Sequence, residues 1–184
     1  MKRRKKLSDA QRINQTSGDV EYYTPPAILH AARRTMGKID LDPFSSRAAN
    51  LRVGAAKIFT AEDDGFSRHW HGSIWMNHPF GRAYNRRAIE KLEKEFLAGR
   101  VIDACCITYA CTSEAWFQPL LRRPQCFLCP RTNYFLPDGS LKRGVTKGSV
   151  VTYYGFESER FAVEFASLGV VKMPHNYLGK GGAS

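Results

Sequence analysis

The segment Asn77-His78-Pro79-Phe80 begins at the last residue of an apolar run, SIWMN, that has the composition of a buried β-strand. Its side chains suit methyl transfer to the exocyclic amine of adenine. The lone pair of that amine is delocalised into the ring, and two acceptors, an amide oxygen and a main-chain carbonyl, can turn it toward an electrophile. An aromatic ring can stack on the base, which leaves the duplex at a cost of a few kcal/mol. Asn77, the carbonyl of His78 and the ring of Phe80 are candidates for these roles.

Two further polar clusters follow expected strands. In the first, DPFSS at residues 42–46, a carboxylate and small hydroxyls can bind the hydroxyls or amino group of a nucleoside ligand. The alternative is that Asp42-Pro43 begins a turn and Ser45 caps a helix. The second, EDDG at residues 62–65, is either part of a ligand site or a solvated acidic turn.

The chain is strongly basic, with 28 Lys and Arg against 17 Asp and Glu and a formal net charge of +11. This balance favours a polyanionic partner such as nucleic acid, although the opening MKRRKK alternatively supplies part of it as a solvated tail. Basic residues beyond Phe80 are candidates for phosphate contacts, or they form a solvated helical face paired with Glu90 and Glu93. The candidates are Arg82, Arg86, Arg87 and, in a later hairpin, Lys142, Arg143 and Lys147.

The chain has no run of about 18 apolar residues, and no apolar stretch follows its basic N-terminus. We therefore expect no membrane span, no secretory signal and a cytoplasmic protein. The five cysteines are an odd number, which indicates reduced thiols. Cys126 and Cys129 form a single C-x-x-C whose side chains would point to opposite faces of a strand, so we expect no metal site.

Apolar segments rich in β-formers alternate with segments of helical periodicity, which predicts an α/β fold with a mostly parallel sheet covered on both faces. The turn signal FLPDGSL predicts an antiparallel hairpin among the last strands, toward the C-terminus. With 184 residues, one domain is expected over 21–174, between a basic disordered arm at 1–20 and a Gly-rich flexible tail at 175–184. We expect strands over 38–43, 55–59, 73–77, 101–109, 125–130 and 149–155, and helices over 25–36, 84–98, 113–121 and 157–168.

Ligands of an open α/β sheet bind outside the carboxyl ends of its strands, and the three polar clusters lie at such ends. Together the segments EYYTPPAIL, IDLDPFSS, TAEDDGF and WMNHPFGR resemble the phage and prophage DNA adenine-N6 methyltransferases, a compact Dam-like family. The similarity runs from about Glu21 to Gly169. It implies S-adenosylmethionine as cofactor, a Rossmann-like class I methyltransferase sheet, and a phage or prophage protein acting in the bacterial host cell.

The resemblance also implies residue roles. Tyr23-Thr24-Pro25 corresponds to a segment that closes over the cofactor, and Asn77, Pro79 and Phe80 correspond to a catalytic tetrad, Asn-Pro-Pro-Tyr/Phe. The residues implied to bind the cofactor are Tyr23, Thr24, Pro25, Asp42, Pro43, Phe44, Ser45, Asp63 and Asp64.

The chain departs from the family pattern in two places. The cofactor loop lacks a Gly-x-Gly, so Ser45 and Ser46 must take that role. His78 replaces the first proline of the tetrad; any residue supplies a carbonyl, and Pro79 still restrains residue 78 to extended conformations, but the fixed φ of proline is lost. The substitution is either tolerated or weakens activity, and the imidazole has three possible new roles: accepting the amine proton, contacting a phosphate, or changing which base fits.

The expected function is methyl transfer from S-adenosylmethionine to adenine N6 in double-stranded DNA. The alternatives are the same transfer to RNA or single-stranded DNA, transfer to cytosine N4, and a nucleic-acid-binding protein that lost turnover through His78.

Tyr109, Thr112 and Trp116 are candidates for the base pocket, with core packing the alternative for Trp116. Because no separate recognition domain is present in the sequence, we expect relaxed sequence preference. We also expect a monomer or weak homodimer.

Overall fold

The computed structural model describes residues 22–136, 138–142 and 145–174. The predicted arm, the predicted tail and Arg143 lie outside these described residues.

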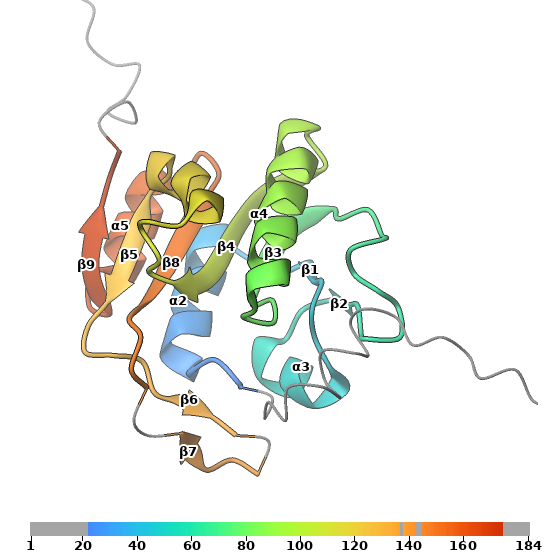
Figure 1. Cartoon of the computed structure of the whole chain (residues 1–184), viewed down its shortest axis with the longest axis horizontal. Helices are drawn as coiled ribbons and strands as arrows, with labels where there is room; N and C mark the ends of the chain where they lie inside the picture. The colour runs from blue at the N-terminus through green and yellow to red at the C-terminus, as the bar shows by residue number, and fades with distance from the viewer. Residues whose placement is uncertain (1–21, 137, 143–144, 175–184) are drawn as a thin grey trace, which may run out of the picture.

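Seven strands form one twisted sheet with the order β2-β1-β3-β4-β8-β5-β9 (Figure 1). Neighbouring strands from β2 to β4 are parallel, whereas β8 lies antiparallel between β4 and β5, and β9 is antiparallel to β5. Because β4 and β5 are both antiparallel to β8, the strands β1 to β5 all run in one direction. This arrangement is compatible with a Rossmann-like fold. The bounds are β1 Leu41–Asp42, β2 Lys57–Ile58, β3 Gly72–Met76, β4 Val101–Tyr109, β5 Gln125–Leu128, β8 Ser149–Tyr154 and β9 Gly169–Lys172.

Helices cover both faces of the sheet because successive strand side chains point to opposite sides. Trp75 and Cys105 belong to the core under the helices α2, α3 and α5, whereas Ile74 and Cys106 belong to the core under α4 and the 3₁₀ helix η1. Figure 1 shows α4 crossing in front of the sheet and α2 behind it. The bounds are α2 Pro26–Met36, α3 Arg47–Val53, α4 Arg82–Leu97, η1 Ala115–Arg122 and α5 Ser158–Phe165.

Three features differ from the sequence expectation. The predicted helix over 113–121 is a 3₁₀ helix, since Pro119 lies inside it and cannot donate a backbone hydrogen bond. The turn FLPDGSL joins β6, Tyr134–Phe135, to β7, Leu141–Lys142, in a separate two-stranded sheet rather than within the main one. The edge strand β9 after Gly169 was not expected, because its Val-Val core is only two residues long.

Candidate functional site

A cleft of about 870 Å³ opens where the strand order reverses. The chain passes from β1 to β2 on one side of β1 and then returns to β3 on the other side. Side chains from the carboxyl ends of β1 and β3, including Asp42 and Asn77, line this cleft. A reversal of this kind is where open α/β sheets bind their ligands.

The loop after β1 is held by its own hydrogen bonds. Asp42 is 2% exposed, and its Oδ1 accepts a hydrogen bond from the Phe44 amide at 3.2 Å. The Ser45 amide donates to the Phe59 carbonyl at 3.0 Å, which fixes this loop to the segment after β2. The helix cap is Ser46, not Ser45: Ser46 Oγ accepts from the Ala49 amide at 3.1 Å. Asp42 and Ser45 line the cleft.

The segment after β2 packs against this loop through a glycine. A Cβ on Gly65 would lie 2.0 Å from the carbonyl oxygen of Pro43, so only glycine permits the observed approach. The Gly65 carbonyl in turn accepts a hydrogen bond from Nε1 of the fully buried Trp70 at 2.8 Å. Gly65 therefore forms part of one wall of the cleft, and the bond from Trp70 holds it in place.

The acidic residues of this segment do not all face the cleft. Glu62 lines it, whereas Oδ2 of Asp63 accepts hydrogen bonds from the amide and the hydroxyl of Thr60, both at 2.9 Å. These bonds lower the pKa of Asp63. Asp64 adopts a positive φ of 52° in the turn. The carboxylate at the mouth of the cleft is thus Glu62, and Asp63 shapes the turn that presents it.

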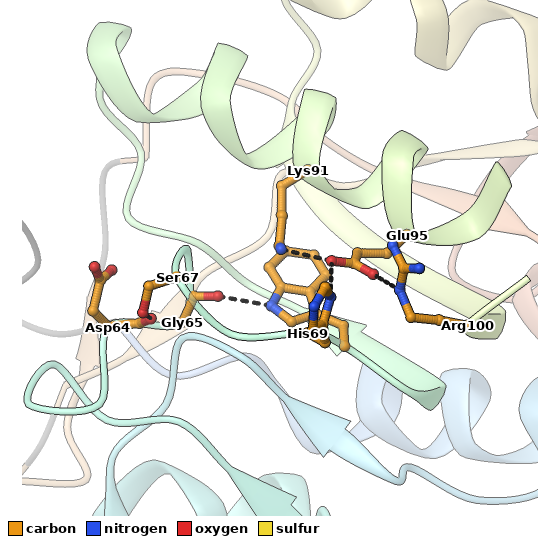
Figure 2. Close-up of polar contacts among 8 residues, drawn as sticks. Asp64, Gly65, Ser67, His69, Lys91, Glu95 and Arg100 are labelled. Atoms are coloured by element: carbon orange, nitrogen blue, oxygen red, sulfur yellow. Dashed lines mark hydrogen bonds and ion pairs between the residues drawn. The ribbon is translucent and has the colours of Figure 1, made fainter. Parts of the chain in front are cut away.

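A second buried network lies behind the wall, at the far end of α4 (Figure 2). Glu95 is 0% exposed and pairs with Lys91 at 2.6 Å, with Arg100, and with His69 at 3.4 Å. Burial raises the pKa of Glu95, but the hydrogen bonds and charges of Lys91 and Arg100 outweigh it and lower the pKa to about 2. The network ties the segment that leads into β3 to α4.

The segment of residues 22–24 reaches over the cleft and contacts the end of β3. Nδ2 of Asn77 donates to the Tyr22 carbonyl and to Thr24 Oγ1, both at 3.4 Å. Tyr23 pairs with Phe135 of β6 through two backbone hydrogen bonds of 2.8 and 2.9 Å. Because both contacts of Asn77 use its amide nitrogen, its Oδ1 takes part in neither.

His78 is buried at the end of β3. It is 1% exposed, and its Nε2 lies 2.9 Å from Oδ1 of Asn85 in the first part of α4. An amide oxygen only accepts hydrogen bonds, so the imidazole donates through Nε2–H. Burial lowers the pKa of His78 to about 4, and the bond to Asn85 offsets this only in part. The ring is therefore neutral at pH 7, and its Nδ1 is buried without a hydrogen-bond partner.

Phe80 stands between the cleft and a smaller pocket of about 200 Å³. Its ring centroid lies 4.6 Å from that of Tyr109, and both residues line both spaces. The smaller pocket is otherwise lined by Tyr22, Tyr134, Lys142, Val145, Thr146 and Lys147. Nζ of Lys147 lies 5.3 Å from the Tyr109 ring centroid. The pocket thus joins aromatic rings to two cations.

The other basic candidates lie elsewhere. Arg86 pairs with Glu90 at 2.7 Å on the exposed face of α4, as the alternative interpretation of this helix expects. The Arg87 guanidinium lies 4.1 Å from the Phe66 ring centroid. Arg82 begins α4, and its side chain is outside the described atoms.

Two cations in the cleft were missed from the sequence. Arg47 and Arg52 of α3 line it, and the Arg52 guanidinium stacks 4.8 Å from the Phe135 ring centroid and 5.7 Å from that of Tyr23. Glu62 and Tyr22 were also missed as separate site residues. In the sequence, only their position next to the motifs pointed to these two residues. Whether their side chains face the cleft depends on the fold.

The structure brings most predicted site residues together. Pro25 instead precedes α2 and does not line the cleft. Thr112 and Trp116 line neither the cleft nor the smaller pocket. Trp116 packs into the core beside Phe117. Predicted residues that line the cleft are Tyr23, Thr24, Asp42, Pro43, Phe44, Ser45, Asn77, His78, Pro79 and Phe80.

Within the described residues, no group of three or more His, Cys, Asp and Glu side chains is arranged to hold a metal ion. Nor does the described part of the chain contain a helix with the length and apolarity to cross a membrane. Comparison of the chain with protein-family models and with curated proteins finds no match.

Proposed function

We propose that this protein is a methyltransferase that uses S-adenosylmethionine to methylate N6 of adenine in DNA. The observation that carries the proposal is the convergence of three separate segments on one cleft: Asn77 to Phe80 after β3, Asp42 to Ser45 after β1, and Tyr22 to Thr24. The resemblance of these same segments to adenine-N6 methyltransferases supports the assignment.

The cleft suits the proposed cofactor in size and in chemistry. Its volume of about 870 Å³ is within the range of roughly 300 to 1,000 Å³ of small-molecule sites. Asp42 and Glu62 offer carboxylates for ribose hydroxyls or an amino group, Arg47 and Arg52 offer cations for a carboxylate, and the Phe44 ring offers a face for a base. When bound, S-adenosylmethionine supplies an electrophilic methyl group on a positively charged sulfur.

The smaller pocket suits the acceptor base. Adenine would stack on Phe80 and Tyr109, while Lys142 and Lys147 at the rim would contact phosphates of the strand. Because Phe80 lines both spaces, a base on this ring lies beside the cleft. The flipped base is the arrangement by which enzymes reach an atom inside a duplex.

Asn77 and the residue 78 carbonyl would orient the amine. The amide nitrogen of Asn77 is held by Tyr22 and Thr24, which fixes which end of the amide is left for the substrate. Its Oδ1 accepts one N–H of the amine and the residue 78 carbonyl accepts the other, so the nitrogen lone pair is aimed into the cleft. As the new N–C bond forms, the bond between the methyl carbon and the sulfur would break, which leaves a neutral thioether, and the amine nitrogen would release one proton to solvent.

The test is incubation of the purified protein with labelled S-adenosylmethionine and unmethylated duplex DNA, followed by nucleoside mass spectrometry. We expect N6-methyladenine, and a loss of at least about 100-fold in rate for Asn77→Ala. Gln118→Ala is the matched control, since this exposed amide lies on η1 and donates to the Thr112 carbonyl.

Single-stranded DNA and RNA are tested in parallel. Product on these substrates alone would replace duplex DNA with another acceptor, and N4-methylcytosine would replace the base. Absence of any methylated nucleoside, with cofactor bound, would overturn the proposal.

A further inference from the structure

The imidazole of His78 is a polar group of the cleft that is buried among aromatic rings. It is 1% exposed, and its ring makes edge contacts with the rings of Phe44 and Phe80, with centroids 6.3 and 5.6 Å away. Its one described hydrogen bond runs to Asn85 of α4, seven residues along the chain. The bond therefore joins the end of β3 to the helix that follows it.

These contacts decide among the roles open to the imidazole. A phosphate contact needs an accessible and charged ring, whereas this ring is buried and neutral at pH 7. A general base works best with a pKa near the working pH, and the pKa of His78 is about 4. Changing which base fits would need the ring in the smaller pocket assigned to the base, and His78 does not line that pocket. The remaining role is mechanical: the ring anchors the backbone to which it is attached.

We propose that His78 is a positioning residue whose Nε2–H bond to Asn85 fixes the direction of the residue 78 carbonyl. The inference rests on the proposed function, because that carbonyl is one of the two acceptors assigned to the amine. A proline at this position would restrain the backbone through a fixed φ. Here Pro79 restrains residue 78 from one side, and the bond to Asn85 with the two flanking rings restrains it from the other.

The pair is tested by a double-mutant cycle on the initial rate of methyl transfer. His78→Leu and Asn85→Ala should each lower kcat about tenfold with the KM for S-adenosylmethionine changed by less than about threefold. Because both changes remove the same bond, the double variant should be no slower than either single variant. Additive losses, or an unchanged kcat in His78→Leu, would overturn the proposal.

A conservative variant separates positioning from packing. The side-chain amide of His78→Gln can donate to Asn85 from about the place of Nε2, so its kcat should recover most of the loss seen in His78→Leu. His78→Pro should also exceed His78→Leu, because it restores a fixed φ. If both variants were as slow as His78→Leu, the bond to Asn85 would not be what orients the carbonyl.

A readout independent of activity keeps this test apart from the test of function. In protein labelled with ¹⁵N-histidine, the ring correlations of His78 should show the Nε2–H tautomer at pH 7, and Asn85→Ala should shift them. The His78→Gln spectrum identifies which of the five histidines is meant. That tautomer without methyl transfer would leave the His78–Asn85 bond standing and remove the proposed function, whereas an Nδ1–H tautomer would contradict donation from Nε2–H to Asn85 and overturn the proposal.

Discussion

A buried titratable side chain lies at each end of α4, and the two differ in their charge. At the cleft, His78 is 1% exposed, makes one hydrogen bond and is neutral, with Nδ1 unpaired. At the far end, Glu95 is 0% exposed and charged, with Lys91, Arg100 and His69 around its carboxylate. Burial disfavours the charged form of both groups, so the number of charged partners decides the outcome.

The two ends of α4 therefore differ in the free-energy cost of their buried polar atoms. An unpaired buried polar atom costs about 1 to 3 kcal/mol, which the cleft end carries at Nδ1. The far end leaves no such cost at its carboxylate, because both oxygens have basic partners. An unpaired buried atom is not special to the cleft, since among the described residues Thr108 Oγ1 in β4 is also buried without a partner.

The largest effect is expected from Glu95→Ala. It leaves Lys91 and Arg100 without their buried partner, so the free energy of unfolding should fall by about 3 kcal/mol in urea denaturation at pH 7. The matched control is Glu90→Ala on the same helix, whose pair with Arg86 is exposed and should matter by less than about 0.5 kcal/mol. Equal losses in the two variants would remove the contrast between buried and exposed charge.

His78 and Glu95, at the two ends of α4, should affect the stability of the protein in two different pH ranges. The unfolded chain protonates His78 near pH 6.5, whereas the folded chain resists until about pH 4, so stability falls as pH drops through that window, by about 3 kcal/mol in total. Glu95 has the opposite relation to charge: its contribution is complete above pH 4.5 and is lost between 4.5 and about 2.

The difference in stability between the natural protein and a variant isolates each of these pH ranges. The stability difference between the natural protein and His78→Gln should change between pH 6.5 and 4, and the difference from Glu95→Gln between pH 4.5 and 2. Thermal or urea unfolding across pH measures both. A His78 difference that is flat from pH 7 to 4 would mean that the imidazole is not kept neutral.

A smaller effect is expected where the scaffold meets the cleft. Gly65→Ala would place a Cβ 2.0 Å from the Pro43 carbonyl oxygen, so the loop after β1 must move. We expect about 2 kcal/mol of destabilisation and weaker S-adenosylmethionine binding by calorimetry. Gly148→Ala is the control, since an added Cβ there meets no atom within 4 Å. Unchanged cofactor affinity in Gly65→Ala would separate this wall from the binding site.

The smallest effect is expected for single lysines. Lys147→Ala at the smaller pocket should weaken DNA binding about equally for all sequences and lower the slope of log K against log salt by about 1. Lys38→Ala is the control, because Lys38 lies before the amino end of β1, whereas the smaller pocket lies at the carboxyl end of β4, and Lys38 pairs with Asp40 at 3.0 Å. Fluorescence anisotropy over a salt series measures both, and equal slopes in the two variants would contradict a DNA contact at this pocket.

The sequence by itself determined, to within two residues, where six of the seven strands of the main sheet end, and which motifs stand at those ends. Val101–Tyr109 was predicted with its observed bounds, and the order of the polar clusters identified three of the cleft's segments. These features are local, because β-formers, helical periodicity and turn residues act over a few neighbouring residues.

Only the tertiary structure decided which side chains face one another. It turned Glu62 toward the cleft and Asp63 into a turn bond, placed Arg52 against Phe135, and gave His78 its partner Asn85. Whether an imidazole is a base, a phosphate ligand or an anchor depends on its burial and on charges from other elements. Those are sums over contacts made far along the chain, and no local pattern of residues contains them.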